Sequence, residues 1–243
     1  MGLPQLGYVA FMVLAFVGFV LARRLVSARE PSRLTGMERF TLALAAFVGG
    51  SLSAKLPFAF ESPDGFWTLS TWAADGKTVT TGLIGAYLSV EIAKMVLGIR
   101  VKTGDGLAIP LAIALSIGRW GCFVNGCCAG KETSLPWCVD FGDGACRHPT
   151  QVYESIFHAI MALVLIFIAR RGLLRYQRLK LYLIAYCVYR FAIEFIRIEP
   201  TWWNGLTYYQ VAVVVFAVFL AAQWIYDAKK LKATDYNLRG FTS

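Results

Sequence analysis

Long apolar runs, separated by short polar segments, dominate the chain. Seven such runs can be counted along the sequence. They cover Leu3–Ala22, Phe40–Phe60, Thr81–Ile99, Leu107–Ile117, Gln151–Ala169, Leu179–Ile196 and Gly205–Tyr226. A helix needs about 20 apolar residues to cross the hydrocarbon core of a bilayer, and most of the runs reach that length. The pattern predicts an all-α membrane protein with seven transmembrane helices.

The fourth run is too short to cross a bilayer by itself. It reaches a sufficient length only if the helix continues through Gly118–Asn125, which places Arg119 and Asn125 near its outer end. The first run has no basic segment before it and no small-residue cleavage site after it, so we interpret it as a helix rather than a signal peptide.

Composition supports a membrane protein. The chain is 57% hydrophobic and 16% charged, with a mean hydropathy of +0.56, whereas soluble domains are about half apolar and about a quarter charged. No polar stretch is long enough to fold by itself. We therefore expect one transmembrane domain, residues 1–243, with a polar outer loop at about residues 118–150.

The distribution of Lys and Arg predicts the orientation. Sixteen of the 24 lie in one set of alternate loops and four in the opposite set. Because cytoplasmic loops are enriched in Lys and Arg, the N-terminus is predicted outside and the C-terminus in the cytoplasm. The net charge of +9 then reflects topology and attraction to anionic lipid. No basic–aromatic motif accompanies it, so we expect the lipid bilayer as a partner and no nucleic acid.

Charged residues inside the apolar runs mark a candidate site, because polar groups are costly at membrane depth. Arg190, Glu194 and Arg197 are spaced by four and three, which puts them on one helical face. This stripe either fixes helix packing as a buried ion pair or binds an anion, since the planar guanidinium matches two phosphate oxygens at once. Arg119 and Glu154 add another guanidinium and carboxylate. The central expectation is that these groups bind the phosphate of a lipid.

Other polar residues within the runs have simpler interpretations. Glu91 and Lys94 are three apart and are expected to neutralise each other. Cys187 is expected to contribute packing, and His158 to be structural rather than a ligand.

The polar outer loop is rich in cysteine. Five of the six cysteines lie there, on the side where disulfides persist: Cys122, Cys127, Cys128, Cys138 and Cys146. Two bridges with one spare thiol would staple the loop, and the sequence does not choose among the pairings. Alternatively, Cys122 or Cys127 is a free catalytic thiol with His148 as its base. The spacing matches no standard zinc pair and histidine is scarce, so we expect no metal and no cofactor.

Five segments, in order along the chain, resemble motifs of bacterial prolipoprotein diacylglyceryl transferases. They are Gly82–Gly85 (GLIG in the family's HGGLIG turn), Gly118–Gly126 (GRWGCFVNG for GRxGNFxNGE), His148–Glu154 (HPTQVYE for HPSQLYE), Tyr189–Pro200 (for YGxxRFxxEFxREPD) and Gly205–Gln210 (for GLTxGQ). The resemblance spans a little over half of the chain.

The resemblance implies a seven-span enzyme of the bacterial cytoplasmic (inner) membrane, with its active site on the periplasmic or outer side. It implies transfer of the diacylglyceryl group of phosphatidylglycerol to a cysteine thiol of a secreted prolipoprotein, or to another thiol acceptor, with release of glycerol 1-phosphate. Arg119 and Arg190 would hold the lipid phosphate, supported by Glu154, Glu194 and Arg197. The matched motifs also give a set of expected substrate-binding residues: Arg197, Asn125, Gly82, Gly85, Gly130, Tyr153 and Gln151.

The chain departs from the family's motifs at three polar positions. Cys122 replaces an asparagine, Cys127 replaces the glutamate of NGE, and Thr80 stands where the family has a histidine that is a candidate thiol base. These departures leave the base open and favour a divergent, cysteine-rich member, either the lipoprotein enzyme or a paralogue with another acceptor. Two other classes remain alternatives: a membrane thiol–disulfide oxidoreductase, suggested by the outer cysteines, and a transporter or lipid-binding scaffold, suggested by the intramembrane charges.

Overall fold

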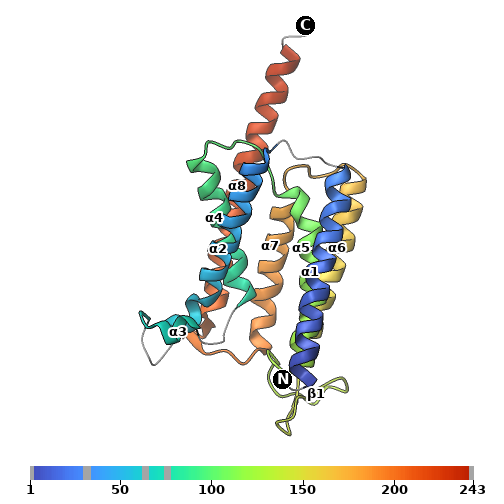
Figure 1. Ribbon diagram of the computed structural model, residues 1–243, viewed down its shortest axis with the longest axis vertical. Coiled ribbons are helices and arrows are strands. Elements are labelled where there is room, and N and C mark those ends of the chain that lie inside the picture. Colours follow the sequence, from blue (N-terminus) through green and yellow to red (C-terminus); the bar gives the residue numbers. More distant parts are fainter. Residues whose placement is uncertain (1–2, 30–33, 62–65, 74–77, 241–243) are drawn as a thin grey trace. The chain divides into compact units, whose positions relative to one another are not determined.

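A computed structural model of the protein is mainly helical, and the part of the chain that it describes also contains two short β-hairpins (Figure 1). The structure describes residues 3–29, 34–61, 66–73 and 78–240. The chain forms two compact units, which are taken in turn below. The smaller unit covers residues 32–102, and the main unit combines residues 1–31 with residues 103–243.

The smaller unit is built on a close pair of long helices, α2 (Gly36–Glu61) and α4 (Val79–Val96), with the short α3 (Leu69–Ala73) between them in sequence. Thr35 and Glu38 form a capping box at the start of α2, in which the Thr35 backbone N–H donates to Glu38 Oε2 at 2.8 Å. Glycines let the two helix backbones approach each other. A Cβ at Gly85 of α4 would overlap the Ser53 side chain of α2.

The predicted pairing of Glu91 with Lys94 is confirmed, because Lys94 Nζ lies 2.9 Å from Glu91 Oε1. Both residues are on α4.

The main unit contains five long helices. They are α1 (Leu3–Arg29), α5 (Asp105–Val124), α6 (Thr150–Arg170), α7 (Arg178–Ile193) and α8 (Tyr208–Gly240). Helix α5 packs against both α1 and α6, while α7 packs against α8 and also contacts α5 and α6. A 3-10 turn, η1 (Glu194–Ile196), continues α7. Helix α5 ends at Val124 with Asn125 as its cap, so the fourth apolar run extends as predicted.

Both hairpins follow helices that end at the same end of the main unit. Strand β1 (Val139–Asp140) pairs with β2 (Cys146–Arg147), and β3 (Thr201–Trp203) pairs with β4 (Leu206–Thr207), both antiparallel. Helix α1 begins at the end that carries β1, and α8 ends at the other end (Figure 1).

Six helices in the described residues are long and apolar enough to cross a membrane: α1, α2, α4, α5, α6 and α8. The prediction of a helical, multi-pass membrane protein is therefore confirmed. Helix α7 is shorter, with 16 residues. Large apolar side chains such as Phe16 and Val215 are exposed on the helices, whereas several of the most buried side chains are polar, including Glu154, Gln151 and Gln210. This is the arrangement expected when the surrounding solvent is lipid.

The end of the main unit away from the hairpins is held by polar contacts. Asp105 at the start of α5 accepts hydrogen bonds from the backbone N–H groups of Tyr176 (2.5 Å) and Arg178 (3.0 Å). Lys180 of α7 forms a buried ion pair with Asp227 of α8. These contacts connect the first turn of α7 to α5 and α8.

Candidate active site

The carboxylate of Glu154 joins three helices near the hairpin end of the main unit. Its Oε1 atom lies 2.5 Å from Arg119 of α5 and accepts a hydrogen bond from the Tyr186 hydroxyl of α7 at 3.1 Å. On α6 itself, His158 Nε2 is 3.7 Å from the same oxygen. The Tyr182 hydroxyl lies 2.8 Å from His158 Nδ1. Glu154 is 1% exposed, so this network is shielded from solvent.

A second carboxylate, Glu194, gathers two more arginines at the end of α7. Its Oε2 atom lies 3.0 Å from Arg190 and 4.0 Å from Arg197, and its Oε1 atom accepts from the Thr207 hydroxyl at 3.2 Å. The Arg190 guanidinium also lies over the Tyr209 ring, 5.2 Å from its centroid, which is a cation–π contact. The predicted stripe is thus brought together, although it crosses from α7 into η1 and the extended residue after it.

The two carboxylates belong to one electrostatic cluster. Glu154 lies within electrostatic range of both Arg119 and Arg190, and Arg197 lies within range of Glu154. The Nε–H groups of all three arginines are buried and have no hydrogen-bond partner. A buried donor without a partner costs free energy. Guanidinium N–H groups are the donors that pair with carboxylate and phosphate oxygens.

The loop between α5 and α6 contacts this cluster through its backbone. The Cys128 carbonyl accepts hydrogen bonds from Thr150 Oγ1 at 2.6 Å and from Arg197 at 3.3 Å. The Cys127 carbonyl accepts from Gln151 Nε2 at 2.6 Å. Gly130 packs directly on the end of η1, because a Cβ there would lie 2.6 Å from the Ile196 carbonyl oxygen. In the structure, Gln151 and Gly130 thus hold the loop; their expected role in substrate binding stays a prediction.

The cysteines of the loop fall into two groups. Cys138 and Cys146 form a disulfide across the β1–β2 hairpin, so one bridge is present where the stapled-loop interpretation had two. Cys122, Cys127 and Cys128 are free, and their sulfur atoms lie within 4.8 Å of one another.

The electrostatic environment of the free thiols is uneven. Hydrogen bonds from the Cys122 and Cys127 thiols, together with the guanidiniums of Arg197 and Arg119, lower the pKa of Cys128. Cys128, which the sequence interpretation did not single out, is therefore the one of the three free thiols whose pKa is lowered.

The remaining predicted residues take no part in the arginine contacts described above. His148 Nδ1 is 3.4 Å from the Tyr153 hydroxyl, which also accepts a hydrogen bond from Trp137 Nε1 at 2.8 Å. Asn125 is the exposed cap of α5. Gly82 and Gly85 lie on α4 of the smaller unit, where they pack on α2. The catalytic role of His148, and the substrate-binding roles of the others, stay predictions.

Sequence interpretation missed several members of the buried network. The ring of His158, which was expected to be structural, lies between Glu154 and Tyr182, two contacts that the sequence interpretation did not anticipate. A spacing of four residues along each helix was the sequence signal that could have identified these residues. Tyr182, Tyr186 and Arg190 follow one another at that spacing on α7, and His158 follows Glu154 at the same spacing on α6.

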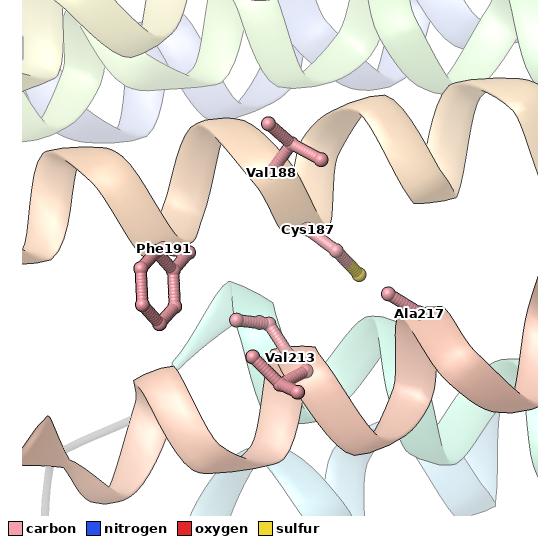
Figure 2. A pocket seen from close by; sticks show the side chains of 6 residues that line it. Cys187, Val188, Phe191, Val213 and Ala217 are labelled. Carbon is pink, nitrogen blue, oxygen red and sulfur yellow. The ribbon is translucent and has the colours of Figure 1, made fainter.

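A small apolar cavity lies between α7 and α8, next to the arginine cluster. Its volume is about 160 Å³, and its lining includes Cys187, Phe191, Val213 and Ala217. Figure 2 shows Cys187 and Phe191 pointing from α7 toward α8. Cys187 is three residues from Arg190, and an α-helix rises 1.5 Å per residue, so the two lie about 4.5 Å apart along the axis.

Comparison with known proteins identifies relatives of this chain. Residues 5–226 match the model of the family described as prolipoprotein diacylglyceryl transferase. The phosphatidylglycerol–prolipoprotein diacylglyceryl transferase of Clostridium tetani is 30% identical over 82% of this chain and 83% of its own length. The enzymes of the same name from Methylococcus capsulatus (33% identical over 74% of this chain and 72% of its own) and Dehalococcoides mccartyi (28%, 80% and 79%) are also similar.

Proposed function

Because the chain belongs to the prolipoprotein diacylglyceryl transferase family, we propose that it moves the diacylglyceryl group of phosphatidylglycerol to the cysteine thiol of a secreted prolipoprotein and releases glycerol 1-phosphate. The names of its relatives support the two substrates. In this proposal the acceptor is the thiol of a protein. An assay with a lipobox peptide and with a small thiol distinguishes this acceptor from a small-molecule acceptor.

One observation carries the proposal: the buried Nε–H groups of Arg119, Arg190 and Arg197 lack hydrogen-bond partners. A phosphodiester offers oxygens that accept from several guanidiniums at once. In the proposal, Arg119 and Arg190 hold the phosphate and Arg197 assists. Glu154 and Glu194 hold the guanidiniums in position through their ion pairs.

The reaction needs a leaving group that tolerates negative charge. The acceptor sulfur forms a bond to the glycerol carbon of the diacylglyceryl group, and the bond from that carbon to the phosphate oxygen breaks. The oxygen takes the electron pair, so the phosphate charge rises from about −1 to about −2 as glycerol 1-phosphate leaves. Guanidiniums held in a site of low dielectric stabilise that developing charge without reorganisation. Cys122, Cys127 and His148 remain the predicted candidates for activating the acceptor thiol.

The apolar cavity between α7 and α8 suits part of an acyl chain. The cavity is open to the protein surface, and at about 160 Å³ it has room for only a short segment of a chain. Since it lies one turn along α7 from Arg190, a lipid phosphate on the arginines would leave its tail beside the cavity.

The topology of the proposed enzyme has seven crossings within one transmembrane domain. Helix α7 with η1 supplies the seventh, the N-terminus lies outside, and the site faces the periplasmic or outer side of the bacterial inner membrane. The Lys and Arg distribution supports this orientation. Alkaline phosphatase and fluorescent-protein fusions at Leu173 and Asn204, the two ends of this segment, would report opposite sides of the membrane if α7 crosses it.

The direct test uses purified protein in phosphatidylglycerol vesicles with a lipobox peptide. Mass spectrometry should show one diacylglyceryl group on the peptide cysteine and glycerol phosphate in solution. A peptide with serine in place of that cysteine, a small thiol, and vesicles of phosphatidylethanolamine are the controls. Arg119→Ala should abolish transfer, whereas Arg170→Ala, at the exposed end of α6, should not. Absence of transfer by the folded wild-type protein would refute the proposal.

A further inference from the structure

We propose that Cys122, Cys127 and Cys128 bind a zinc ion whose open fourth position takes the thiol of the acceptor. Their sulfur atoms lie within 4.8 Å of one another, and within the described residues this is the one group of three potential metal ligands so arranged. Zinc prefers thiolate sulfur, and catalytic zinc sites have three protein ligands and one open position. This inference rests on the proposed transfer to a thiol.

The end of α5 brings the first two cysteines together. The Cys127 N–H donates to the Cys122 carbonyl at 3.1 Å, and the Gly126 N–H donates to the Phe123 carbonyl at 3.1 Å. Gly126 has φ = +69°. These are the bonds of a Schellman motif, in which the side chains at the positions of Cys122 and Cys127 contact each other. The contact is therefore a consequence of how the helix ends.

Cys128 completes the group from a backbone conformation that costs free energy. Its φ is +66°, in the left-handed region that favours glycine. The hydrogen bonds from Thr150 and Arg197 to its carbonyl hold it in that conformation. A glycine would relieve the strain at this position, so the presence of a thiol indicates that the side chain has a use.

The dimensions fit the metal. With Zn–S bonds of about 2.3 Å, tetrahedral ligands lie about 3.8 Å apart, so the three sulfurs need to move by about 1 Å or less. Three thiolates and Zn²⁺ carry a charge of about −1, and Arg119 and Arg197 lie within electrostatic range of Cys128 to balance it. Cys128 is exposed while the other two are half-buried, so the group is accessible from outside.

Such a zinc ion would supply what the transfer reaction needs. A thiol that coordinates zinc is deprotonated, and the proton goes to water. The zinc-bound acceptor sulfur then donates its electron pair to the glycerol carbon, and the pair of the breaking carbon–oxygen bond leaves with the phosphate. No oxidant or reductant is involved. Arg197 of the arginine cluster donates a hydrogen bond to the backbone carbonyl of Cys128, whose thiol is one of the proposed zinc ligands. The site of the nucleophile and the site of the leaving group are therefore next to each other.

The test measures metal binding separately from activity. Full-length protein, purified without chelator, is expected to contain one equivalent of zinc by elemental analysis. Cys122→Ser, Cys127→Ser and Cys128→Ser should each lower zinc affinity by more than about 100-fold, beyond the effect of losing an outer contact. Cys187→Ser, on α7, is the matched control and should bind zinc like wild type. Protein loaded with Co²⁺ should show thiolate-to-cobalt charge-transfer absorption, and its spectrum should change with the lipobox peptide but not with the serine peptide.

The outcomes separate this inference from the proposed function. Absence of stoichiometric zinc, a disulfide among the three cysteines on mapping of the non-reduced protein, or a Co²⁺ spectrum unchanged by the thiol peptide would overturn the zinc site even if transfer occurs. Zinc bound by all three thiols and a spectral response to the peptide would support it even if phosphatidylglycerol is not the donor.

Discussion

Replacing Arg190 by lysine tests whether the guanidinium fork, rather than a positive charge, is what the reaction uses. Arg190 is 2% exposed and contacts Glu194 Oε2 at 3.0 Å, while its Nε–H has no partner. Lysine keeps the charge and the contact with Glu194 but loses the planar fork. Arg190→Ala would be less informative, because removing one partner of a buried ion pair can cost about 3–5 kcal/mol of stability by itself.

The magnitude follows from the number of donors lost. Removing one donor to a developing oxyanion costs about 2.7–4 kcal/mol, or about 10²–10³ in kcat. We expect Arg190→Lys to lower kcat by that factor in phosphatidylglycerol vesicles, with little change in Tm in detergent. Arg170→Lys, on the exposed end of α6, is the matched control and should keep wild-type kcat.

The reasoning fails if folded Arg190→Lys retains kcat within about threefold of wild type, since that is less than about 0.7 kcal/mol of barrier. It also fails if Arg190→Lys lowers Tm but leaves the kcat of the folded protein unchanged. In either case Arg190 would be a structural ion-pair partner, the alternative that the sequence left open.

Three further predictions concern other parts of the main unit. Asp227→Ala removes the carboxylate that the buried Lys180 contacts, so detergent unfolding should show a loss of about 3–5 kcal/mol, while Lys180→Met with Asp227→Leu should restore most of it. The pKa of Asp143 is lowered, chiefly by its hydrogen bond with Arg147. The contribution of Asp143 to the stability of the hairpin is therefore present above the ordinary aspartate pKa and is lost as the pH falls through the lowered pKa. Protection of the hairpin amides from hydrogen exchange should decrease in that acidic range in the wild type and stay constant in Asp143→Asn. Ala217→Phe fills the cavity between α7 and α8 and should raise KM for long-chain phosphatidylglycerol several-fold more than for a short-chain analogue; equal changes for both lipids would mean that no acyl chain enters it.

Sequence periodicity predicted the helices well because apolar runs of this length have few alternatives. The extension of the fourth run to Val124 followed from the length of a membrane crossing. The charges were equally predictable, since Glu91 and Lys94 pair along one helix face. The contact of Arg119 with Glu154 was not, because it joins α5 to α6 and a spacing along one helix says nothing of a neighbouring one.

The arrangement of the cysteines depends on backbone conformation and strand pairing, which the number and spacing of the cysteines do not reveal. Cys122 and Cys127 contact each other because Gly126 ends the helix in a left-handed conformation. The Asn125–Gly126 pair is a sequence signal for such a helix end. The bridge between Cys138 and Cys146 depends on the pairing of two-residue strands, which are too short for a periodic pattern. Cys128 was overlooked because nothing in the sequence predicts a positive φ at a non-glycine residue.

The two ends of the main unit provide an internal comparison for the arginine cluster. Arg178, at the first turn of α7, is also buried at 2% exposure, but its Nε–H donates to the Leu173 carbonyl at 3.1 Å. The corresponding groups of Arg119, Arg190 and Arg197 lack a hydrogen-bond partner. Burial alone therefore does not explain the open donors, since the same fold satisfies the Nε–H of a buried arginine where the role is to hold helices together. In the function proposed above, the phosphate of the lipid would supply acceptors for these three Nε–H groups. Arg178→Lys should accordingly lower stability without the selective loss of kcat that Arg190→Lys produces.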